Sequence, residues 1–266
     1  MRASSMSILR GAAARMSIGL VLKQIGLALL VSLLFALWLQ VPDASVLEVA
    51  VSVVLALVVL AGAGVGESWI ILQLSDRERT RSRLLRGALL LLIGFALFFF
   101  WDKVIDHWRL KDSLRAGYLN SRFPHSLRIL FSYENVLLWL GWMWSALEWI
   151  GAGVVAIVVY AATVSRQPVH ATSRTLRSGP YWFVLIVSVL TASVITGLLI
   201  RWTPGHGLSG EMTSLAFRLG LVVIVDAIVM CFFLSVLAVC MLNADSDYVA
   251  STGMPEDNQP RTVEGP

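Results

Sequence analysis

Long runs of apolar residues, separated by short polar stretches, dominate the pattern along the 266-residue chain. Six runs are long enough to cross the roughly 30 Å of hydrocarbon in a bilayer as α-helices. They cover residues 25–41, 46–72, 84–101, 135–163, 181–200 and 215–242. The in/out alternation typical of membrane strands is absent, and open sheet edges are not viable in lipid. The pattern predicts an all-α polytopic transmembrane helix bundle with about six spans, forming a transmembrane domain over residues 1–242.

Residues 102–134, between the third and fourth spans, form a segment of mixed character. The segment is too polar to cross a membrane, yet it is too rich in Trp, Leu and Phe for a simple solvated loop. Such a mixture is typical of helices that lie in the membrane interface, and Pro124 would interrupt one. We therefore expect an interfacial helical segment broken near Pro124, which covers the mouth of the bundle or, alternatively, binds a substrate.

The two ends of the chain differ in character. The first apolar run follows four basic residues, as in a signal peptide, but it is longer than a usual signal core and no clear cleavage site follows it. We expect it to be retained as a span. Residues 243–266 are acidic and contain scattered Pro and Gly, which predicts a disordered cytoplasmic tail.

Composition agrees with a membrane environment. Hydrophobic residues make up 57% of the chain and charged residues only 14%, with a mean hydropathy of +0.76. A soluble protein of this size needs far more polar surface, so membrane lipid is the expected partner. The net charge of +4 does not indicate nucleic-acid binding, because the basic residues sit in short runs between apolar segments.

The distribution of basic residues predicts the orientation. Lys and Arg are retained on the cytoplasmic side of a membrane, and they gather before the first span, at residues 75–86 and at residues 165–179. Both termini should then be cytoplasmic, in a cell (plasma or inner) membrane. Residues 102–134 argue against this orientation because they carry six basic residues on the expected outer side.

One basic cluster could also contact anionic lipid headgroups, which attract cationic side chains at the cytoplasmic leaflet. Its members are Arg77, Arg79, Arg81 and Arg83. Topology determination is the simpler interpretation of these residues.

Three carboxylates within or near the spans form the candidate polar site. Glu148 and Asp226 sit near the middle of the fourth and sixth spans, and Glu67 lies nearer the cytoplasmic end of the second. Ionisable groups inside a membrane are costly and often functional. Two interpretations stay open: the carboxyl groups fasten the bundle, or they form an ion or proton site.

Helical spacing predicts the surroundings of these groups. Glu148 shares a face with Gly141, Ser145 and Ala152, whereas Trp139, Trp142 and Trp149 cluster on another side. Glu148 should therefore point into the bundle, with the Gly62 and Gly66 face as a plausible packing partner. The same small-residue faces could support a homo- or hetero-oligomer. Asp226 has only apolar residues on its own face, and Arg218 is an imperfect partner for it.

Enzyme motifs are weakly supported. The chain lacks H-E-x-x-H and C-x-x-C, so no metal site, cofactor-binding site or catalytic residue is expected. Ser209 lies in a Gly-Leu-Ser-Gly sequence like that of some intramembrane proteases, but no His follows it in the chain. A lipid-modifying enzyme built from Ser209, His206 and groups near Pro124 is a third hypothesis, and we expect the protein not to be an enzyme.

Two functional hypotheses follow. The first is a small transporter or permeation protein in which an intramembrane carboxylate binds a cation or a proton. The second is a non-catalytic membrane subunit or scaffold that binds a partner protein. A cavity that reaches one of the carboxylates would favour the first hypothesis, and a fully packed interior would count against it.

Overall fold

The computed structural model describes residues 5–42, 44–124, 131–202 and 208–252. Within these ranges the chain forms nine helices and no strand. They are α1 (Ser5–Arg15), α2 (Ile18–Trp38), α3 (Val46–Leu74), α4 (Arg81–Arg109), α5 (Asp112–Arg122), α6 (Tyr133–Val164), α7 (Pro168–Leu176), α8 (Gly179–Arg201) and α9 (Leu208–Thr252).

The prediction of an all-helical fold with six spans is confirmed. Six helices are long and apolar enough to cross a membrane, namely α2, α3, α4, α6, α8 and residues Gly210–Ser246 of α9. Serine side chains cap the first turns of several of them, and Ser17 accepts a hydrogen bond from the Leu20 amide of α2 at 3.2 Å. By the length and the composition of its helices, the chain is therefore a multi-pass membrane protein.

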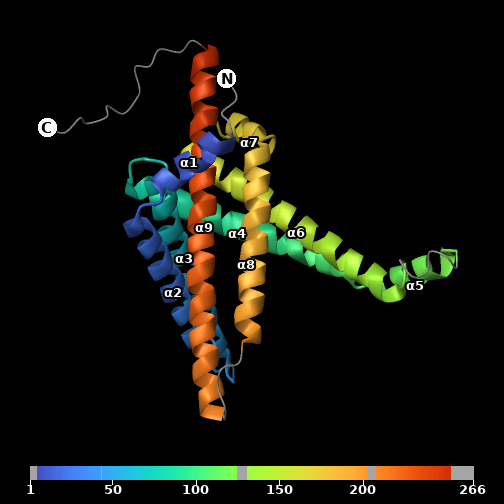
Figure 1. Cartoon of the computed structure of the whole chain (residues 1–266). Helices are drawn as coiled ribbons and strands as arrows, with labels where there is room; N and C mark the ends of the chain where they lie inside the picture. Colours follow the sequence, from blue (N-terminus) through green and yellow to red (C-terminus); the bar gives the residue numbers. More distant parts are fainter. Residues whose placement is uncertain (1–4, 43, 125–130, 203–207, 253–266) are drawn as a thin grey trace.

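The helices form a bundle with a lateral extension (Figure 1). Helices α2, α3, α8 and α9 run along one direction, and α9 packs against both α2 and α8. The short helices α1 and α7 cross one end of this bundle, where both contact α9. Helices α4 and α6 pack along each other and lean away from α8 and α9, with α5 at the tip. We call residues 99–124 and 131–151 the arm.

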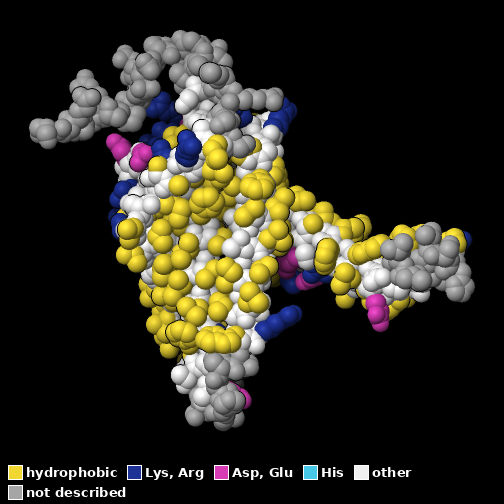
Figure 2. Space-filling model, in the orientation of Figure 1, with side chains coloured by type: hydrophobic (Ala, Val, Ile, Leu, Met, Phe, Trp, Pro, Cys, Tyr) yellow, Lys and Arg dark blue, Asp and Glu magenta, His cyan; other side chains and the backbone are white. Residues whose placement is uncertain are grey.

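Basic residues gather at the end of the bundle that carries α1 and α7 (Figure 2). We call this the basic end; its described basic residues are Arg10, Arg15, Lys23, Arg77, Arg79, Arg81, Arg83, Arg86, Arg166, Arg174 and Arg177. The segments predicted to share the cytoplasmic side therefore do lie at one end of the molecule. Which compartment this end faces stays a prediction.

The buried core lies next to the basic end. Tyr160, Tyr181 and Leu237 are almost completely buried there. The Tyr181 hydroxyl donates to the Gly153 carbonyl at 2.8 Å, and the Tyr160 and Ser75 hydroxyls lie 2.8 Å apart. These bonds satisfy polar atoms that burial removes from solvent, so α3, α6 and α8 are held together at this end.

Away from the core, apolar side chains cover the surface of the bundle (Figure 2). The most apolar stretch of α3 is only 6% buried inside the protein, compared with 50% for α9. Val46 and Leu47 of α3, for example, are 89% and 75% exposed. An aqueous environment would strongly disfavour such a surface, whereas hydrocarbon accepts it.

The segment between the third and fourth spans differs in detail from the prediction. Helix α4 continues beyond Trp101 to Arg109, because Lys103 pairs with Asp106 at 2.9 Å along the same helix. Residues 102–109 thus belong to α4, and α5 is the separate short helix. Part of the expected second helix after Pro124 falls on residues 125–130, outside the described ranges.

The carboxyl-terminal boundary also differs. Helix α9 does not stop at Leu242 but continues through Thr252. Tertiary contacts hold this extension: Asp245 accepts hydrogen bonds from Ser165 Oγ at 2.5 Å and from Arg77 Nη2 at 3.2 Å, and Ala244 is fully buried. The tail predicted from Asn243 therefore begins with an ordered helical segment, and residues 253–266 lie outside the described ranges.

Candidate functional site

Glu67 is the candidate carboxylate that lies inside the bundle. Its Oε1 accepts a hydrogen bond from Gln24 Nε2 of α2 at 2.6 Å. Its Oε2 is buried and has no hydrogen-bond partner among the described residues, and the same is true of Gln24 Oε1. A buried carboxylate oxygen without a partner is costly unless it takes up a proton or a cationic group. The pair therefore has unused capacity to bind a donor.

An apolar pocket adjoins this carboxylate. The pocket has a volume of about 230 Å³ and is lined by four helices, α3, α4, α6 and α9. Its lining is apolar except for Glu67 and the Tyr160 hydroxyl. Gly94 of α4 contributes to the wall without a side chain, which lets α4 approach Val155 and Val159 of α6 closely.

The pocket is open toward the lipid-facing surface and closed toward the basic end. Phe95 and Met230 line it and are 56% and 42% exposed, so that side reaches the surface. At the other side Tyr160 lines the pocket and its hydroxyl is bonded to Ser75 at the end of α3. A ligand would thus enter sideways from the membrane.

Asp226 is exposed on α9, and no hydrogen bond or ion pair involving it occurs among the described residues. It precedes Met230 by four positions and Leu237 by eleven, so it shares the face of α9 that lines the pocket. The rise of a helix puts it about 6 Å beyond Met230 along the axis. Asp226 therefore lies on the same face of α9 as the pocket residues, just outside the opening near Met230.

Arg218 does not serve as a partner for Asp226. It is 7% exposed and donates to the Ile200 carbonyl at 2.8 Å and to the Ser214 carbonyl at 3.2 Å. The last carbonyls of α8 have no partner within that helix, and a cation near a helix C-terminus is favourable. Arg218 instead joins the end of α8 to α9.

Glu148 lies in the arm, where its side chain is 19% exposed and faces α4 instead of the Gly62 and Gly66 face of α3. Its Oε1 is 2.7 Å from Arg109 Nη2 of α4, whose extension brings this cation beside α6. One oxygen each of Asp102, Asp106 and Glu148 lie within 4.8 Å of one another. Lys103 and Arg109 already occupy this acidic group, so a metal ion would have to displace them.

The predicted small-residue faces are only partly used. Gly66 packs on α2, where an added Cβ would lie 2.6 Å from Leu27 Cδ1. Gly62 and Gly141 have open space beside them instead, so the Gly62 face does not pack against Glu148. Trp142 is 72% exposed, as expected for the outward-facing Trp side of α6.

The four arginines of the basic cluster have separate roles. Arg77 pairs with Asp245 at 3.2 Å, and the Arg79 guanidinium lies over the Trp69 ring, 5.0 Å from its centroid. Arg81 and Arg83 are exposed in the first turn of α4. The four arginines therefore do not form one continuous cationic surface.

Sequence reasoning missed two partners, Gln24 and Arg109. Gln24 immediately precedes the predicted first span and could have been noticed as an amide at its edge, since it is the kind of group that binds a carboxylate in a bundle. Arg109 lay beyond the predicted end of its span. His125, His206 and the Ser209 side chain lie outside the described part of the structure.

Three comparisons, with protein-family models, with curated proteins and with solved structures, find no match to this chain. The arrangement of its side chains is therefore the basis for a functional proposal.

Proposed function

We propose that the protein is a small membrane transporter that takes an amphipathic cation from the bilayer into the pocket beside Glu67. One observation carries this proposal. An apolar pocket within the membrane-spanning helices has a single carboxylate in its wall, and one oxygen of that carboxylate is buried with no hydrogen-bond partner in the described part of the chain.

The lining supports a ligand with a cationic head and a hydrocarbon body. Pockets for small molecules are mostly apolar with a few placed polar groups that fix orientation. Phe95, Phe98 and Met230 offer contacts for a hydrocarbon chain or ring, while Glu67 offers a counter-ion. An ammonium group that donates to Glu67 Oε2 would give this oxygen its missing partner.

The size of the pocket limits the ligand. Its volume of about 230 Å³ is just below the 300–1,000 Å³ common for drug-sized ligands. A monoamine with one ring or a short chain fits this volume, whereas a two-chain phospholipid does not.

Asp226 supports a route into the pocket. Its exposed carboxylate lies on the pocket face of α9, about one helical turn beyond Met230. A cation arriving from the lipid side would meet Asp226 first and Glu67 second. The hydrogen bond between Tyr160 and Ser75 closes the opposite side of the pocket. Alternating access requires one side of a site to be closed while the other is open.

A flux assay in proteoliposomes tests this function. The probe is radiolabelled benzylguanidinium, because its N–H groups can donate to Glu67 Oε2 and it stays protonated at neutral pH, which keeps passive leakage low. We expect uptake above that of empty liposomes, and a loss of about tenfold or more in Glu67→Gln, since a buried charge pair contributes more than 1.4 kcal/mol. Asp226→Asn should raise KM more than it lowers the maximal rate.

Glu48→Gln is the matched control, because it makes the same change in the same helix but lies 19 positions before Glu67, about 28 Å away along the axis. It should leave uptake unchanged. Uptake no greater than in empty liposomes, or equal uptake by the wild type and Glu67→Gln, would contradict the proposal.

One observation favours the second candidate, a non-catalytic subunit. Asp226 is exposed and the arm presents Trp142 and Leu138, 72% and 53% exposed, so a partner helix would find both a charge and an apolar surface. A partner that co-purifies from native membranes in fixed ratio, and that is lost in Asp226→Asn but retained in Glu67→Gln, would support this role over transport.

A further inference from the structure

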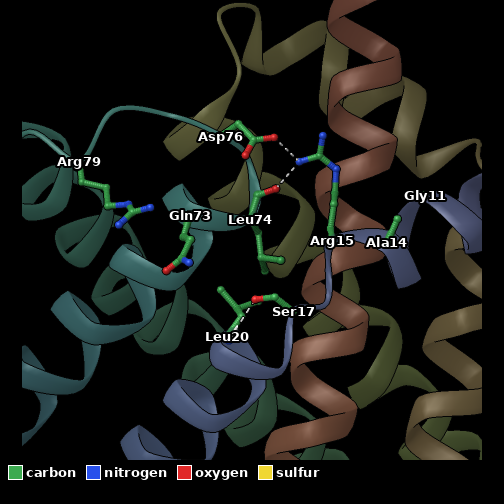
Figure 3. Close-up of a pocket in the computed structure, with 9 residues that line it drawn as sticks. All are labelled: Gly11, Ala14, Arg15, Ser17, Leu20, Gln73, Leu74, Asp76 and Arg79. Carbon is green, nitrogen blue, oxygen red and sulfur yellow. Dashed lines mark hydrogen bonds and ion pairs between the residues drawn. The ribbon is translucent and has the colours of Figure 1, made fainter. Parts of the chain in front are cut away.

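A second cavity lies at the basic end, away from the proposed transport pocket. Its volume is about 600 Å³, and it lies between the α1–α2 turn and the end of α3 (Figure 3). Arg15 and Ser17 line one side, and Gln73, Asp76 and Arg79 line the other. In contrast to the transport pocket, this cavity is lined mainly by polar groups.

Two arginines face this cavity with unused donors. Figure 3 shows Arg15 and Arg79 on either side of Gln73. Arg15 uses Nη1 for Asp76 Oδ2 at 2.8 Å and for the Leu74 carbonyl at 2.5 Å, which leaves its other guanidinium donors for a ligand. The structure assigns Arg79 no hydrogen bond or ion pair among the described residues.

Trp69 holds additional positive charge beside the cavity. The Lys23 ammonium lies 4.4 Å from the centroid of its ring, and the Arg79 guanidinium lies 5.0 Å from it. Cations over an aromatic face are held by the ring quadrupole. Asp76 is the acidic group that lines the cavity, and its side chain is 78% exposed and already paired with Arg15. The electrostatic balance therefore favours an anion.

Gln73 provides an unused polar group in the wall. Its Oε1 is buried without a hydrogen-bond partner among the described residues. Its Nε2 is not buried in this way and has no hydrogen-bond partner among the described residues, so it can donate to an anion in the cavity.

The start of α2 adds a further contribution. Ser17 caps the helix and accepts from the Leu20 amide, while the earlier amides of the first turn have no partner within the helix. Amides of this kind, together with the helix dipole, favour phosphate groups. Since Ser17 and Leu20 both line the cavity, this positive end lies at its wall.

From these contacts we infer that the cavity binds a phosphate group, held by Arg15, Arg79 and Gln73 at the start of α2. The phosphate belongs either to the headgroup of an anionic phospholipid or to a soluble phosphate ester. Two guanidinium groups suit phosphate because their planar donors can bind two oxygens at once. The cavity lies where α2 begins and α3 ends, the level at which headgroups meet a spanning helix.

Binding is tested on the full-length protein with three probes. These are inorganic phosphate, glycerol 3-phosphate, and nanodiscs of phosphatidylcholine with or without phosphatidylglycerol. Lipid retained by the protein is measured by native mass spectrometry, and the soluble anions by calorimetry. Retention of phosphatidylglycerol over phosphatidylcholine identifies a headgroup, whereas saturable binding of glycerol 3-phosphate identifies a soluble ester.

Arg79→Gln and Arg83→Gln form a matched pair, because each removes one exposed arginine of the same cluster but only Arg79 lines the cavity. We expect Arg79→Gln to weaken binding of the successful probe about tenfold, as for the loss of a charge-assisted hydrogen bond, and Arg83→Gln to leave it unchanged. Gln73→Leu should also weaken binding without removing charge. Equal losses in the two arginine variants, or no saturable binding of any probe, would overturn the inference.

Discussion

Gln24 of α2 and Glu67 of α3 form a hydrogen-bonded pair inside the bundle, with 2.6 Å between Gln24 Nε2 and Glu67 Oε1. Gln24 is 2% exposed, so no solvent replaces this bond if it is lost. Each side chain keeps one buried oxygen without a partner among the described residues. The pair therefore joins two spanning helices and still has capacity for a proton or an ammonium group.

The first prediction concerns the stability of this pair. Gln24→Leu removes the donor and leaves the Glu67 carboxyl without a hydrogen bond in an apolar environment. We expect the free energy of unfolding in detergent to fall by about 1–3 kcal/mol. Gln40→Leu is the control, because Gln40 is exposed after the end of α2. Identical unfolding curves for the two variants would show that the pair makes no contribution.

The second prediction concerns the ion pair between Arg109 and Glu148 in the arm. Their side chains are 34% and 19% exposed, so solvent screens the interaction only in part. A double-mutant cycle with Arg109→Gln and Glu148→Gln should give a coupling free energy of about 1 kcal/mol in detergent unfolding. Glu148→Gln combined with Arg122→Gln, at the end of α5, should be additive. Additivity in both cycles would mean that the pair does not hold α4 to α6.

The positions of the spans could be predicted from sequence because hydropathy averaged over about 20 residues depends only on composition. The observed helices contain all six predicted runs except residues 39–41. The ends of α4 and α9 were harder to predict. Polar residues at 102–109 and 243–252 lower the hydropathy, yet ion pairs and contacts such as that of Asp245 with Ser165 continue the helices.

The partners of the intramembrane carboxylates could not be predicted because they come from other helices. Apolar helices present similar faces, and the sequence contains no signal for which of them meet. Glu148 was expected in the interior on the basis of its own face, but α6 packs along α4 and Arg109 lies there. The tilt of α4 and α6 away from α9, which opens the pocket near Met230, likewise depends on contacts between helices.

The third prediction concerns packing at Gly94, where α4 meets α6. A Cβ at this position would lie 2.6 Å from Val159 Cγ2 and 3.2 Å from Val155 Cγ1. Valine side chains have little rotamer freedom in a helix, so they cannot move aside cheaply. Gly94→Ala should therefore lower the free energy of unfolding by about 1–3 kcal/mol.

Gly62→Ala is the control for this substitution. A Cβ at Gly62 meets nothing within 4 Å, so only the helix propensity changes. We expect it to be neutral or to stabilise the protein by up to about 1 kcal/mol. A Gly94→Ala variant as stable as Gly62→Ala would contradict the close packing of α4 against α6 at Gly94.

The last prediction tests the orientation with cysteine labelling in intact cells. The native Cys231 and Cys240 are 0% and 7% exposed, so a membrane-impermeant maleimide should not label the wild type. Ser82→Cys places a thiol at the basic end, and Ser45→Cys places one at the start of α3, at the opposite end of that helix. With the basic end cytoplasmic, Ser45→Cys should react in intact cells and Ser82→Cys only after the membrane is permeabilised. The reverse pattern would show that the six basic residues of 102–134 outweigh those of the basic end, and labelling of both sites in intact cells would contradict a spanning α3.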